Sequence, residues 1–84
     1  MRITLKLYAS LSQHLPVEAR EGNQVSLDIE SGTSILRVVE PYKLPAKLVH
    51  LVLVNGVYVP REQRDTHALR DGDVLAIWPP VAGG

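Results

Sequence analysis

Four short apolar segments, two alternating and two continuous, limit most strongly what this chain can fold into. Residues 2–8 and 25–30 carry an apolar side chain at every second position, which is typical of strands with one buried face. Residues 50–54 and 74–78 are apolar at nearly every position and also predict strands. The segment from Thr33 begins with hydroxyls that can cap a helix. The chain therefore predicts an α+β fold, one mixed sheet of four to five strands with a helix packed across one face.

The connections between these segments contain turn residues. Asn55-Gly56 is the strongest hairpin signal in the chain, and Asp71-Gly72-Asp73 predicts a turn before the last strand. The predicted helix places Ile35, Leu36 and Val39 on its sheet-facing side.

The two continuous apolar strands predict an exposed apolar patch. One helix covers one face of the sheet, so the other face stays apolar if these strands are neighbours, and such patches often mark protein contacts. Alternatively, the polar loop around residues 17–24 folds over that face. The candidate partner surface consists of Leu51, Val52, Leu53, Val54, Ile77 and Trp78.

Composition excludes several classes of function. The 84 residues allow one domain, and nine basic against nine acidic residues without a basic cluster argue against nucleic acid as a partner. The absence of cysteine removes disulfides and thiolate metal sites, and the three histidines lack metal-site spacing. No apolar stretch is long enough for a membrane helix, so we expect no membrane partner and a cytoplasmic protein. The charged residues of segment 61–65 are expected to be solvated.

The last six residues predict a tail with chemistry of its own. We expect a domain at 1–78 and an extended, flexible tail at 79–84, which spans roughly 20 Å when extended. Pro79 and Pro80 stiffen its start, and Val81 and Ala82 can fill small pockets. Gly83 and Gly84 carry no Cβ, so the terminal carboxylate can enter a narrow channel. An unstructured end without a role is the alternative.

The complete tail, with Val54-Asn55-Gly56, residues 69–74 and the strand ending at Trp78, resembles the sulfur-carrier family of molybdopterin and thiamine biosynthesis. This resemblance covers essentially the whole chain and implies a ubiquitin-like β-grasp fold. The Pro-Pro-Val-Ala-Gly-Gly ending is most similar to small subunits of molybdopterin synthase. The resemblance implies a carrier that acts as a co-substrate, has no catalytic residue, and binds neither a cofactor nor a metal.

The resemblance also implies a mechanism and partners. An E1-like enzyme would use ATP to adenylate Gly84, and a sulfur donor would convert the adenylate into a thiocarboxylate. The large synthase subunit would receive the tail, from Pro79 to Gly83, and pass the sulfur to a pterin precursor. Three alternatives remain: delivery to thiamine thiazole or to tRNA thiolation, a ubiquitin-like modifier attached to lysines, and a plain β-grasp binding module.

Overall fold

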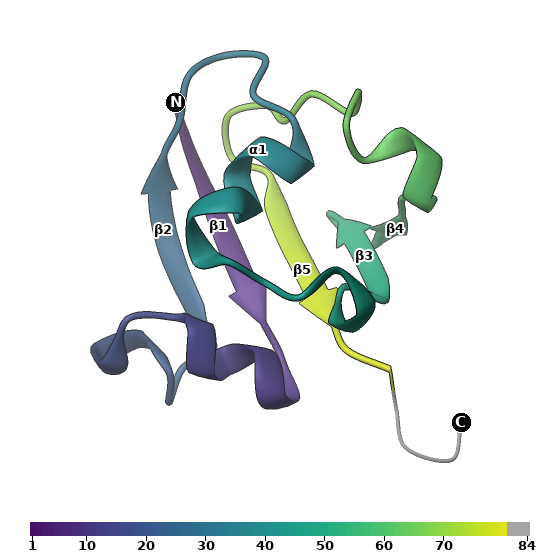
Figure 1. Cartoon of the computed structure of the whole chain (residues 1–84). Helices are drawn as coiled ribbons and strands as arrows, with labels where there is room; N and C mark the ends of the chain where they lie inside the picture. The colour runs from purple at the N-terminus through teal and green to yellow at the C-terminus, as the bar shows by residue number, and fades with distance from the viewer. Residues whose placement is uncertain (81–84) are drawn as a thin grey trace.

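The strands form one mixed sheet with a helix across one face, as Figure 1 shows for this computed structural model. The structure describes residues 1–80. The sheet order is β2-β1-β5-β3-β4; β1 and β5 are parallel, and the other neighbours are antiparallel. The strands are β1 (Arg2–Leu7), β2 (Gln24–Asp28), β3 (Leu51–Val54), β4 (Val57–Tyr58) and β5 (Val74–Trp78). The predicted fold class is confirmed, with five strands.

The single α-helix within the described residues, α1 (Ile35–Val39), is short and begins where the sequence predicts. The Ser34 side chain accepts a hydrogen bond from the Arg37 amide at 3.3 Å, which caps the first turn. Short 3₁₀ turns make up much of the remaining chain. They are η1 (Ala9–His14), η2 (Val17–Ala19), η3 (Glu40–Tyr42), η4 (Ala46–Leu48) and η5 (Arg61–Gln63).

The sheet-facing side of α1 differs from the prediction at one position. Ile35, Val38 and Val39 are buried, whereas Leu36 is 43% exposed. Positions i, i+3 and i+4 from Ile35 share one helical face, and Leu36 lies about 100° away from Ile35 around the axis. The prediction was therefore wrong about which side of α1 faces the sheet. Leu36 is an apolar side chain on the surface of the domain.

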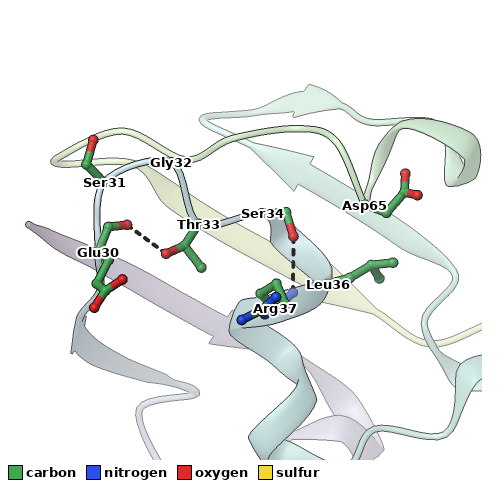
Figure 2. Close-up of a pocket in the computed structure, with 8 residues that line it drawn as sticks. All are labelled: Glu30, Ser31, Gly32, Thr33, Ser34, Leu36, Arg37 and Asp65. Atoms are coloured by element: carbon green, nitrogen blue, oxygen red, sulfur yellow. Dashed lines mark hydrogen bonds between the residues drawn. The ribbon is translucent and has the colours of Figure 1, made fainter.

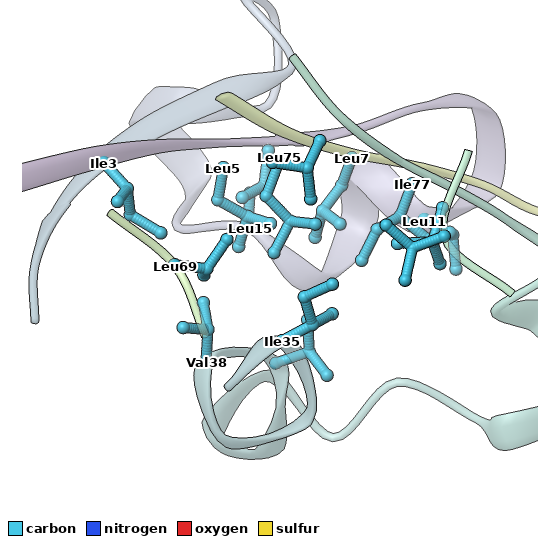
Figure 3. Close-up of a cluster of buried hydrophobic side chains, with 14 residues drawn as sticks. Ile3, Leu5, Leu7, Leu11, Leu15, Ile35, Val38, Leu69, Leu75 and Ile77 are labelled. Carbon is cyan, nitrogen blue, oxygen red and sulfur yellow. The ribbon is translucent and has the colours of Figure 1, made fainter. Parts of the chain in front are cut away.

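The core lies between the sheet and α1 and is built from aliphatic side chains (Figure 3). β1 contributes Ile3, Leu5 and Leu7, each at most 1% exposed. Leu11 and Leu15 come from the connection between β1 and β2 and are also fully buried. The chain has no phenylalanine, so these leucines supply the apolar area that a domain of this size needs.

A side-chain network joins the two predicted turns. Asn55 has φ 51°, as the first residue of a type I′ hairpin turn requires. The side-chain Nδ2 of Asn55 donates to Asp73 Oδ1 at 2.8 Å, and Asn55 Oδ1 accepts from the backbone amide of Val74 at 2.8 Å. Asp73 Oδ2 accepts from the Arg70 amide at 2.8 Å. Both turns are confirmed, and their side chains hold the start of β5 beside the end of β3.

We expect Asp73→Ala to lower the free energy of unfolding by about 2–3 kcal/mol, because it leaves the Arg70 amide and the Asn55 side chain without their acceptor. Urea denaturation followed by circular dichroism measures this change. Asp71→Ala is the matched control, since the exposed Asp71 accepts only from the Arg2 amide. Equal losses in the two variants would contradict the role of the network.

Arg64 departs from the solvated loop predicted for segment 61–65. It is 4% exposed, and its guanidinium donates to three backbone carbonyls. Nε reaches Val59 O at 3.1 Å, Nη1 reaches Val49 O at 3.2 Å, and Nη2 reaches His50 O at 3.1 Å. The other charged residues of the segment, Arg61, Glu62 and Asp65, are exposed as predicted.

Candidate functional site: the open sheet face and the base of the tail

The face of the sheet opposite α1 carries the predicted apolar patch. β3 and β5 are neighbours, with Leu51 opposite Trp78 and Leu53 opposite Ala76, and opposite residues share a face. Tyr58 of β4 pairs with Leu53 and is 53% exposed. The open-face patch, as defined here, consists of Tyr8, Leu51, Leu53, Tyr58, Ala76 and Trp78.

Half of the predicted partner surface lies on the other side of the sheet. Val52 and Ile77 are fully buried and Val54 is 7% exposed, all within the core beneath α1. The prediction was wrong for these three residues because successive side chains on a strand point to opposite faces. Leu51, Leu53 and Trp78 remain candidates for partner contact.

The loop that could have covered the patch packs elsewhere. Asn23 O accepts from the Leu7 amide at 3.0 Å, and Ala19 packs against the core cluster. Figure 1 shows this dark-blue segment below the end of β1 and the start of β2, away from β3. The loop therefore closes the end of the core and does not cover the open-face patch, in which Leu51, Leu53 and Trp78 are partly exposed and Ala76 is buried.

An aromatic pair marks the base of the tail. The Tyr8 and Trp78 rings stack with centroids 4.2 Å apart and an interplanar angle of 2°. The Tyr8 amide donates to Ile77 O at 3.1 Å, and the His50 amide donates to Trp78 O at 3.2 Å. β5 is therefore fixed on both sides up to its last residue. Because Ile3, Leu5 and Leu7 face the core, alternation along β1 places Lys6 and then Tyr8 on the open face of the sheet. The sequence pattern could therefore have predicted the position of Tyr8.

The expected tail begins at a buried residue. Pro79 is buried and Pro80 is exposed, so the packed body includes Pro79. Val81, Ala82, Gly83 and Gly84 lie outside the described residues. Pro79 and Pro80 follow Trp78, which lies at the edge of the open-face patch. A protein that covers the patch therefore also lies beside the start of the tail.

Polar groups elsewhere in residues 1–80 have structural roles. His14 Nδ1 lies 3.2 Å from Tyr42 O, and burial raises the pKa of the Tyr42 phenol, which stays protonated at neutral pH. No three His, Asp or Glu side chains in this part of the chain gather as metal ligands do. No helix there has the length and apolar character to cross a membrane.

A hollow beside the connection from β2 to α1 is shown in Figure 2. Two of its three hydroxyl groups, those of Thr33 and Ser34, are already bonded to the backbone. The Thr33 hydroxyl donates to Glu30 O at 2.7 Å, and Ser34 Oγ accepts from the Arg37 amide. These bonds form a turn and a helix cap, so the hollow offers no arrangement specific to a ligand.

Comparison with known protein families shows to which family this chain belongs. The family model described as ThiS matches residues 7–84, nearly the whole chain, including the Gly83-Gly84 pair. The chain belongs to the ThiS family. No sequence among the curated proteins matches this ThiS-family chain. The predicted membership of the sulfur-carrier family is confirmed.

Solved structures share the fold of this ThiS-family chain. SAMP1 from Haloferax volcanii is 23% identical, with full coverage of both chains and a TM-score of 0.69. A chain from the complex of subunits 1 and 2 of molybdopterin-converting factor from Helicobacter pylori is 16% identical, with full coverage of both chains and a TM-score of 0.62. ThiS from Geobacter metallireducens is 18% identical, with 96% of this chain and 99% of that chain covered and a TM-score of 0.60.

Proposed function

We propose that this chain is a cytoplasmic sulfur carrier whose Gly84 carboxylate is converted to a thiocarboxylate for molybdopterin biosynthesis. The observation that carries the proposal is that the family match extends through Gly83 and Gly84. A body that is fixed up to Pro79 beside an accessible apolar patch supports it. The chain itself acts as a co-substrate, and its partners supply the catalytic groups.

The chemistry requires activation of the carboxylate. A carboxylate is a poor electrophile, so an E1-like enzyme first joins Gly84 to AMP from ATP and releases pyrophosphate. Sulfide (HS⁻) released by a sulfur donor attacks the acyl carbon, the bond to the AMP oxygen breaks so that AMP leaves, and loss of the proton on sulfur gives the thiocarboxylate. Its sulfur is a stronger nucleophile than the oxygen it replaces and can attack the acceptor bound by the large synthase subunit.

When a partner binds the open-face patch, the start of the tail is held at a fixed position relative to that partner. Ordering a free segment costs about 1–2 kcal/mol per residue, and the burial of Leu51, Leu53 and Trp78 against a partner offsets part of that cost. Pro79 and Pro80 reduce it further, because their φ angles are already restricted. Docking of the body therefore places the last residues in the partner's channel with less loss of entropy.

We expect Leu53→Glu to weaken binding to the activating enzyme and to the large synthase subunit by about tenfold or more, since it buries an unpaired charge at the centre of the patch. Isothermal titration calorimetry measures both affinities. Val57→Glu is the control on the same hairpin, because Val57 is 68% exposed and lies next to β3 at Val54. Similar losses in both variants would contradict docking through the open face.

The tail motif favours molybdopterin over the other acceptors. The test is to offer the loaded carrier separately to the large subunit of molybdopterin synthase with its pterin substrate and to a thiazole synthase. We expect sulfur transfer only with the first. Transfer only in the thiazole reaction, or to tRNA through a thiolase, would reassign the pathway. Isopeptide adducts on lysines in cell lysate would support the ubiquitin-like modifier, which uses the same activated Gly84.

A further inference from the structure

A second apolar surface lies on the helix side of the sheet, in a groove between α1, the segment around η4, and η5. Figure 1 shows α1 and the segment around η4 in front of the sheet, and the green segment with η5 next to β4. Leu36, Val39, Leu44 and Val49 supply the apolar lining. Lys47 and Arg61 are exposed at its sides. We call this surface the basic groove.

The walls of the basic groove are held by Arg64. Its three hydrogen bonds, to the carbonyls of Val59, Val49 and His50, connect the end of η5 to the segments before β3 and after β4. A planar guanidinium with three fixed acceptors is a rigid connection. The groove is therefore formed before any partner binds, so less entropy is lost when it is filled.

The charges around the groove have one sign. Lys47, Arg61 and Arg64 line it, and no carboxylate does. Asp65 lines the neighbouring hollow (Figure 2) and not the groove. The whole chain has zero formal net charge, so this concentration of positive charge is local. Such a field favours a partner with carboxylates.

The exposed Leu36 gives the groove an apolar contact that the domain itself does not use. Its side chain is 43% exposed on a helix whose other apolar residues are buried. The ubiquitin-like core is complete without it, because Ile35, Val38 and Val39 already face the sheet. A partner that buries Leu36 would remove its exposed apolar surface from water, which favours binding.

We propose that the basic groove binds a segment of a partner protein that presents leucine-like side chains flanked by carboxylates. The groove and the open-face patch lie on opposite sides of the sheet. A partner in the groove can therefore remain bound while the open face and the tail are engaged elsewhere. This inference stands whether or not Gly84 carries sulfur.

The test is a titration of the ¹⁵N-labelled full chain with a blocked peptide of leucine and glutamate residues, followed by amide chemical shifts. We expect shifts at Leu36, Leu44 and Val49, with the amides of Leu51 and Leu53 unchanged. A peptide with glutamine in place of glutamate should bind about tenfold more weakly, and salt should weaken the first peptide. Shifts only on the open face, or equal binding of both peptides, would overturn the proposal.

Charge-reversal variants distinguish binding in the groove from nonspecific electrostatic attraction between the acidic peptide and the protein. Lys47 and Arg61 are exposed, so Lys47→Glu with Arg61→Glu should fold normally and reduce peptide affinity by about tenfold or more. Lys6→Glu changes the charge of β1 on the opposite face and should leave the affinity unchanged within about twofold. An equal loss in Lys6→Glu would overturn the proposal. So would groove shifts on removal of residues 81–84 without peptide, because the chain's own end would then be the occupant.

Discussion

Replacing Gly83 with valine is expected to abolish thiocarboxylate formation while leaving the melting temperature of the domain unchanged. Gly83 lies outside the described residues 1–80, and none of the contacts described for the fold involves it. A β-branched side chain beside Gly84 restricts the backbone and adds bulk where a narrow channel admits glycine. A displacement of the reacting carbonyl by about 1 Å can cost about a hundredfold in rate. Single-turnover loading with the activating enzyme, followed by mass spectrometry, measures this effect.

The matched control is Ala82→Val, which adds apolar bulk one residue farther from the reacting carbonyl. We expect this variant to load at a rate close to that of the natural chain, because Ala82 already carries a Cβ. Both variants should show the same unfolding curve. Normal loading of Gly83→Val would contradict the channel argument, and equal loss in both variants would show that the whole tail is sensitive to bulk rather than the glycine pair.

Arg64→Met is expected to lower the free energy of unfolding by about 3–4 kcal/mol, a larger effect than that of Asp73→Ala. The variant keeps the aliphatic volume but leaves the carbonyls of Val59, Val49 and His50 without their shared donor. Hydrogen bonds from a charged donor contribute about 1.5–3 kcal/mol each. Because small domains are stable by only about 5–15 kcal/mol in total, the variant should melt at a markedly lower temperature.

The control for Arg64→Met is Arg61→Met. Arg61 is exposed and three residues earlier in the same segment, so its replacement should change the free energy of unfolding by less than about 0.5 kcal/mol. Urea denaturation of both variants, followed by circular dichroism, gives the comparison. A stable Arg64→Met variant would show that water or a rearranged backbone satisfies the three carbonyls.

The strands and turns could be predicted because their signals are local. Alternation fixed the inward face of β1, and Asn55-Gly56 fixed the hairpin through the positive φ angles that a type I′ turn needs. β3 and β5 are apolar on both faces, so the pattern did not show which side chains face α1. That is why Val52, Val54 and Ile77 were assigned to the partner surface although they form the core.

The role of Arg64 could not be predicted, for a different reason. A charged residue in a polar segment is usually solvated, and its burial here depends on carbonyls contributed by separate parts of the chain. The exposure of Leu36 similarly depends on which side of a short helix packs against the sheet, and four of the five helical residues are apolar. The chemistry proposed for Gly84 comes from the tail sequence and the family match, whereas the structure contributes the fixed base at Trp78 and Pro79.

The intact mass of the full chain, after incubation with an E1-like enzyme, ATP and a sulfur donor, tests the central claim most directly. We predict an adenylated species when the donor is omitted. With the donor present, we predict a product in which one oxygen of the Gly84 carboxylate is replaced by sulfur. A chain lacking Gly84 should show neither species. An unchanged mass, under conditions in which the same enzyme loads its own carrier, would contradict the account.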